Sequence, residues 1–131
     1  MKSRFARILF VLSVGLLALQ LGTAQVNKGS QRVFSGEITD TFCAKNKSHD
    51  QMMSEMKSMG TDKQSCAQKC VQIGAKYVLL DTAKGTVYQL DDQAKAAAFA
   101  GREVRIVGTL ENSELKIASI NAGSSTVASG R

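Results

Sequence analysis

The three cysteines and the only histidine of this 131-residue chain all fall within residues 41–71. Cys43 comes first, His49 follows six residues later, and Cys66 and Cys70 lie four apart. Thiolate and imidazole are ligands that zinc, copper and other soft or borderline transition metals prefer. In an oxidising compartment, cysteines also form disulfides. The stretch therefore predicts either a metal site or a disulfide.

In a metal site, all four of these residues would be ligands. On a helix, Cys66 and Cys70 would lie on one face, so their sulfurs could meet at one ion. With Cys43 and His49 they would form a closed Cys3His site of the structural zinc type. Copper(I) is the second candidate, because His49 and Met53 share a helical face and thioethers are soft ligands. The spacing matches no common zinc-finger pattern, and the haem attachment motif Cys-x-x-Cys-His is absent.

A disulfide is the alternative. Cys43 would then pair with Cys66 or Cys70 and leave the third thiol free. Such a bond would join the helical region to the rest of the domain and stabilise it by about 2–4 kcal/mol. The protein would then be a structural or protein-interaction module without metal. Asp40, three residues before Cys43, is expected to be only a turn carboxylate.

The first residues have the pattern of a secretory signal peptide. Three basic residues precede an apolar run at 8–21, and small residues occupy 22–24. We expect residues 1–24 to be removed by cleavage after Ala24, and the protein to be periplasmic or secreted. The run is shorter than the roughly 20 apolar residues of a membrane span. No membrane contact is therefore expected after cleavage.

Charge and composition argue against several function classes. The leader holds three of the 17 basic residues and no acid, so 14 basic and 11 acidic residues remain, a net charge of +3. The basic residues are scattered and aromatic residues make up only 5%, which argues against nucleic-acid binding. There is no second histidine, nucleophile elbow or phosphate-binding loop, so no catalytic activity is predicted. We expect a monomeric binding module, with a metal ion as its possible ligand.

Alternating apolar residues and turn residues predict five strands. They are expected at 33–39, 77–81, 86–90, 103–110 and 115–120. Helices are expected at 49–59, 61–74 and 92–100. The order of strand, helical hairpin, two strands, helix and two strands is that of the OB-fold, a small five-stranded barrel. The predicted class is therefore mainly β (α+β), an OB-like barrel with a helical hairpin between its first two strands.

Capping residues define the helical hairpin. Ser48 is expected to cap the first helix, with Gln51 completing a capping box, and Thr61 to cap the second. Four methionines at helical spacing indicate a packed stripe rather than metal ligands. They are Met52, Met53, Met56 and Met59.

These elements divide the chain into four parts. Residues 1–24 form the signal peptide and 25–31 a flexible lead-in. Residues 32–122 form the OB-like domain, with its helical insertion at 48–74. Residues 123–131 are rich in Gly, Ser and Ala and are expected to be a disordered tail.

Three features of the sequence are distinctive. They are the run G-E-I-T-D-T-F-C at 36–43, the Cys66-x-x-x-Cys70 spacing and the segment G-A-K-Y-V-L at 74–79. Together they resemble a family of secreted bacterial proteins known as a domain of unknown function. The resemblance covers nearly all of the chain after the leader. It implies a small periplasmic or secreted domain with a Cys/His cluster on an OB-like barrel, and it implies no established activity.

Overall fold

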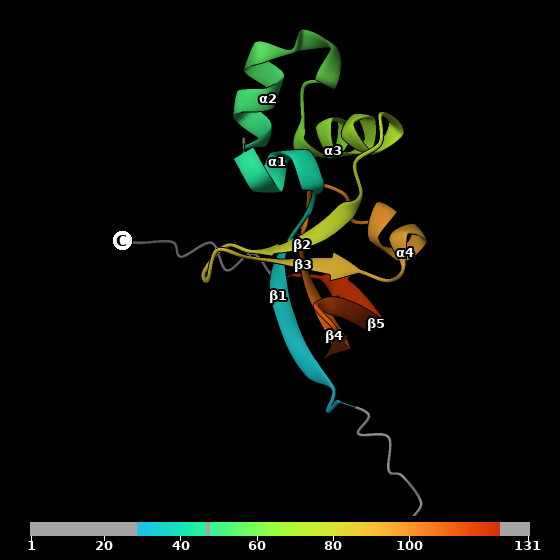
Figure 1. Ribbon diagram of the computed structural model, residues 1–131. Helices are drawn as coiled ribbons and strands as arrows, with labels where there is room; N and C mark the ends of the chain where they lie inside the picture. Colours follow the sequence, from blue (N-terminus) through green and yellow to red (C-terminus); the bar gives the residue numbers. More distant parts are fainter. Residues whose placement is uncertain (1–28, 47, 124–131) are drawn as a thin grey trace, which may run out of the picture.

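The computed structural model describes residues 29–46 and 48–123 (Figure 1). The predicted signal peptide, the start of the lead-in and the tail beyond residue 123 lie outside the described residues. Within the described part, no helix has both the length and the apolar character needed to cross a membrane.

The chain folds into five strands and several short helices, so the predicted α+β class is confirmed. The strands are β1 (Arg32–Asp40), β2 (Tyr77–Asp81), β3 (Thr86–Leu90), β4 (Glu103–Glu111) and β5 (Glu114–Ala122). The helices are α1 (Thr41–Asn46), α2 (His49–Glu55), the 3₁₀ turn η1 (Lys57–Met59), α3 (Lys63–Gln72) and α4 (Gln93–Ala97).

The sheet closes on itself in the order β1-β2-β3-β5-β4. Closure depends on β1, which pairs with β4 through residues 32–37 and with β2 through residues 37–40. Gly36 stands where β1 changes partner. A Cβ atom there would lie 2.2 Å from the carbonyl oxygen of Leu80, so only glycine allows this approach of the two strands. The pairing of β3 with β5 is parallel, and the other four pairs are antiparallel.

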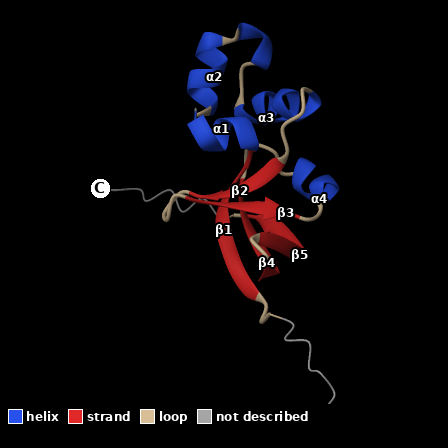
Figure 2. Ribbon diagram, viewed as in Figure 1, coloured by secondary structure: helices blue, strands red, loops and turns tan. Residues whose placement is uncertain are grey.

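Two hydrophobic clusters stabilise the molecule. The larger one fills the barrel, where Ile38, Leu79, Ile106 and Leu115 are fully buried. The smaller one lies among α1, α2, η1 and α3, which gather at one end of the barrel (Figure 2). It contains the three cysteines. The helical insertion therefore has its own small core, which meets that of the barrel at Val71.

The helix predicted at 92–100 is shorter in the structure, as α4, and the helices of the insertion differ from the prediction in three further ways. The helix predicted at 49–59 ends at Glu55, because Met56 is extended and exposed, and η1 then returns Met59 to a buried position. Ser48 does cap α2, accepting a hydrogen bond from the Gln51 nitrogen at 3.2 Å. The cap of α3 is Asp62, not Thr61.

The third difference is α1, which was not predicted. Its first turn is formed around Asp40, whose Oδ1 accepts hydrogen bonds from the backbone nitrogens of Phe42 at 2.9 Å and Cys43 at 3.1 Å. The expected turn carboxylate therefore begins a short helix directly after β1. This helix holds Cys43 at the end of the barrel.

Candidate metal centre

The two helix cysteines lie where α3 faces the rest of the insertion. Cys66 and Cys70 are fully buried in the smaller cluster, whereas Ala67, between them on α3, is buried against the barrel core. The helix begins where Asp62 Oδ1 accepts a hydrogen bond from the Ser65 nitrogen at 2.9 Å. After the helix ends, the Cys70 carbonyl accepts a hydrogen bond from the Ala75 nitrogen at 3.0 Å. Both cysteines are thus held rigidly by local backbone structure.

The three thiols meet in one place. The sulfurs of Cys43, Cys66 and Cys70 all lie within 4.8 Å of one another. All three residues are buried, and all three are free thiols rather than disulfide partners. The predicted convergence of the cysteines is present. The disulfide alternative does not form in this structure.

His49 takes a different position from the one expected for a simple four-ligand set. It is buried in the first turn of α2, and it groups with Asp40 and Cys43, within 4.8 Å of one another, rather than with the two helix cysteines. Two overlapping groups therefore share Cys43. Sequence reasoning missed Asp40 as a site residue, although its place three residues before Cys43 was a usable signal.

Two polar atoms beside Cys43 have no hydrogen-bond partner. They are Asp40 Oδ2 and His49 Nδ1, and no other buried side-chain oxygen or nitrogen in the described residues lacks a partner. The remaining polar atoms of both residues are satisfied. Asp40 Oδ1 caps α1, and His49 Nε2 lies 2.9 Å from Thr39 Oγ1 and 3.2 Å from Glu37 Oε1. The unpartnered atoms therefore mark one buried location.

Burial determines the protonation of the thiols. It raises the pKa of Cys66 and Cys43, and the neighbouring Asp40 carboxylate raises both further. Burial and Asp40 also raise the pKa of Cys70 from its ordinary value of 9.0 to about 12. The thiols of the metal-free protein are thus neutral at neutral pH. A cation among them would favour the thiolates, because metal binding releases thiol protons.

A second set of charges lies behind His49. Glu37 Oε1 faces His49, and Glu37 Oε2 lies 2.6 Å from Lys63 Nζ. Burial alone would raise the pKa of Glu37, but the hydrogen bonds from His49 and Lys63 outweigh it and lower that pKa. This polar chain connects β1 with α2 and α3.

Methionines close the site on another side. Met59 is buried beside the cysteines, and Met52 and Met53 are half-buried against the same cluster, whereas Met56 is exposed. The predicted methionine stripe is thus wrong at Met56, because α2 ends before it. The other three help to separate the thiols from water.

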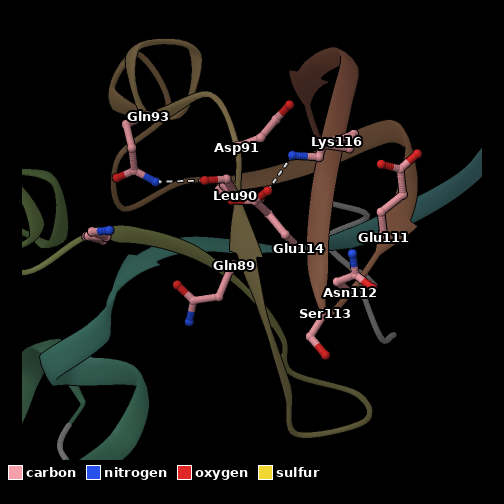
Figure 3. A pocket seen from close by; sticks show the side chains of 10 residues that line it. Gln89, Leu90, Asp91, Gln93, Glu111, Asn112, Ser113, Glu114 and Lys116 are labelled. Atoms are coloured by element: carbon pink, nitrogen blue, oxygen red, sulfur yellow. Dashed lines mark hydrogen bonds and ion pairs between the residues drawn. The ribbon is translucent and has the colours of Figure 1, made fainter.

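Apart from the cysteine cluster, a hollow of about 640 Å³ lies at the turn between β4 and β5 (Figure 3). Its walls are largely polar, and several of their groups are engaged internally. Lys116 pairs with Glu114, and Asp91 Oδ1 accepts a hydrogen bond from the Ile117 nitrogen at 2.9 Å. The hollow shares no residue with the cysteine cluster.

No curated protein and no solved structure gives a significant match to this chain. A family model does match part of it. The match covers β2 to β5 and includes Cys70, whereas Cys43, His49 and Cys66 precede it. Over residues 70–128 the chain is similar to the family described as "Protein of unknown function (DUF5818)", which confirms the resemblance to a domain-of-unknown-function family.

Proposed function

We propose that the protein is a small binding module whose helical insertion holds one soft transition-metal ion, Zn²⁺ or Cu⁺. Cys43, Cys66 and Cys70 are three of the ligands, and His49, which lies within 4.8 Å of Cys43 but outside the group of three thiols, would move toward the ion as the fourth. One observation carries this proposal: three buried free thiols lie within 4.8 Å of one another, beside the two unpartnered buried atoms of Asp40 and His49.

The energetics of burial support an ion at this place. A buried polar atom without a partner costs about 1–3 kcal/mol, so folded proteins rarely keep one. Here Asp40 Oδ2 and His49 Nδ1 are both left unpartnered in one small region. A cation bound among the thiolates would interact favourably with a carboxylate oxygen and with an imidazole lone pair. It would also offset the negative charge of the thiolates.

The ion has a structural role in this proposal. Its ligands come from α1, α2 and α3, so it would tie the three helices together at the end of β1. A closed set of protein ligands leaves no open position for a substrate, which distinguishes structural from catalytic zinc sites. This agrees with the expectation of a binding module without catalytic activity.

We further propose that the barrel is OB-like and that the protein acts outside the cytoplasm. The strand order β1-β2-β3-β5-β4, with a helix between β3 and β4, supports the OB-like assignment. The leader pattern at residues 1–24, with cleavage after Ala24, supports a periplasmic or secreted location.

Native mass spectrometry of the reduced protein after addition of zinc or copper(I) tests the metal site. We expect one ion per chain. Cys66→Ser and Cys70→Ser should each abolish this binding, whereas Gln68→Ala, between them on α3, should leave it unchanged. If the reduced protein binds no metal and the protein prepared without reductant is lighter by two hydrogens, the proposal is contradicted. That result would favour the disulfide-stapled module.

A further inference from the structure

We infer that Glu37 is a positioning residue of the proposed metal site: its carboxylate holds the Nε2 edge of His49 and so leaves Nδ1 free to bind the ion beside Cys43, which makes the site selective for a divalent, borderline ion such as Zn²⁺. This inference rests on the proposed function and deepens it. Nothing in the sequence pattern of cysteines and histidine points to Glu37.

The burial of Glu37 is unusual for its position in the strand. Val33, Ser35, Glu37 and Thr39 alternate on the face of β1 that lies opposite to Phe34 and Ile38. The first two are exposed, whereas Glu37 and Thr39 are 8% and 2% exposed, because the helical insertion lies over this end of the strand. Glutamate is almost never fully buried unless it is paired. The two partners of Glu37 therefore explain its presence there.

Those partners determine which nitrogen of His49 carries a proton. Glu37 Oε2 contacts the Lys63 ammonium at 2.6 Å, and Oε1 lies 3.2 Å from His49 Nε2. An ionised carboxylate can only accept a hydrogen bond, so we assign the proton of the ring to Nε2, which makes the Thr39 hydroxyl a second acceptor. In a neutral imidazole, Nδ1 then keeps its lone pair. Nδ1 is the atom that is buried and unpartnered.

Thr39 restricts the ring further. Its Oγ1 lies 2.9 Å from the same Nε2, so the ring edge is held between two oxygens of β1. His49 is therefore fixed by the barrel, although it belongs to the insertion. Metal-binding histidines commonly donate their other ring N–H to a carboxylate, which fixes the tautomer and raises ligand basicity. His49 and the Glu37 carboxylate are arranged in this way here.

The choice of ion follows from the contribution of the imidazole. Copper(I) is soft, and thiolates alone can hold it. Zinc is borderline and prefers four ligands in a tetrahedral arrangement, so it gains more from a fixed fourth nitrogen. Loss of Glu37 should therefore weaken zinc binding and leave copper(I) binding unchanged. A general loss of structure would weaken both.

Competition titrations with Zn²⁺ and with Cu⁺ on the full chain test this inference. Loss of such a partner typically costs about 10–100-fold in metal affinity. We expect Glu37→Leu to fall in this range for zinc. Glu37→Gln, which keeps a neutral acceptor, should lie at the lower end, about tenfold. Copper(I) affinity should be unchanged in both variants.

Cobalt(II) provides a spectroscopic reading of the same site. The visible spectrum of Glu37→Gln bound to Co²⁺ should shift part of the way toward that of His49→Ala, because Glu37→Gln weakens the hold on the imidazole that His49→Ala removes. Lys63→Met is the matched control. It removes the half-exposed partner of Glu37 but leaves the contact to His49, so its spectrum should match the wild type.

The outcomes separate the two proposals. If the wild type binds neither ion, the metal site itself is wrong and the inference falls with it. If the wild type binds zinc and Glu37→Gln has the same affinity and the same cobalt spectrum, only the role of Glu37 is wrong. Equal losses of zinc and copper(I) would also overturn it, since Glu37 would then act only through the fold. Glu37→Gln is decisive if Glu37→Leu does not fold.

Discussion

At the scale of single residues, two aspartates determine where the cysteines stand. Asp40 begins α1 and so places Cys43, and Asp62 begins α3 and so places Cys66 and Cys70. A side-chain oxygen that accepts a backbone N–H at a helix start satisfies a donor that would otherwise lack a partner. The positions of the three thiols thus depend on local hydrogen bonds at the starts of α1 and α3.

The cap of α3 should depend on pH. The backbone hydrogen bond from Ser65 lowers the pKa of Asp62 below its ordinary value of 3.8. A carboxylate with a lowered pKa stabilises the fold above that ordinary value, and the stabilisation is lost as the pH falls through the lowered pKa. We expect Asp62→Ala to lower the urea midpoint at neutral pH, and the difference from wild type to vanish in strong acid. Asp62→Asn, which still caps, should remove only the pH dependence. An Asp62→Ala deficit that persists unchanged in acid would contradict this.

At the scale of elements, β1 connects the two parts of the molecule. One face contributes Ile38 to the barrel core, and the other contributes Glu37 and Thr39 to the insertion. Alternating side chains along a strand make this possible. A substitution on the Ile38 face should therefore affect the barrel core, and one on the Glu37 face should affect the helical insertion.

Ile38→Ala tests the barrel side of β1. Ile38 is fully buried in the larger cluster, so its truncation should lower the free energy of unfolding by about 2–5 kcal/mol. Val33→Ala, on the same strand but with Val33 54% exposed, should change it by no more than about 0.5 kcal/mol. Urea denaturation measures both. Similar values for the two variants would be evidence against the packing described for β1.

At the scale of the whole molecule, a barrel with a large core carries an insertion with a small one. The insertion cluster contains only a few buried apolar side chains besides its three cysteines. Regions with few buried contacts open locally more often than the rest of a protein. An ion with ligands on three helices should therefore stabilise the insertion most.

Hydrogen exchange should reveal this difference. Zinc should slow amide exchange within residues 41–75 and leave β3 and β5 nearly unchanged, because the ion binds only where its ligands lie. Cys70→Ser should abolish the zinc effect. Equal slowing throughout the chain, or none, would show that the ion does not act on the insertion.

Local patterns in the sequence were enough to predict the five strands and most of the turns. Alternation of apolar and polar residues is a local pattern, and it predicted β2 and β3 to the residue, while the other strands extend one to three residues beyond their predicted limits. Gly85, in the turn between β2 and β3, has a φ of 65°, as its place in the sequence indicated. The helices were less certain, because their ends depend on packing. Met56 and Met59 are both methionines of the predicted helical stripe, yet Met56 is exposed and Met59 is buried.

The residues that surround the cysteines are brought there by folding and could not be predicted from local patterns. The spacing of Cys66 and Cys70 predicted a shared helical face, but the approach of Cys43 depends on α1, which no periodic pattern marks. Glu37 is 12 residues from His49 and 26 from Lys63, so no local signal connects them. The closing of the barrel and the docking of the insertion bring these groups together. Local sequence patterns carry no information about such distances, because they arise from packing between distant segments.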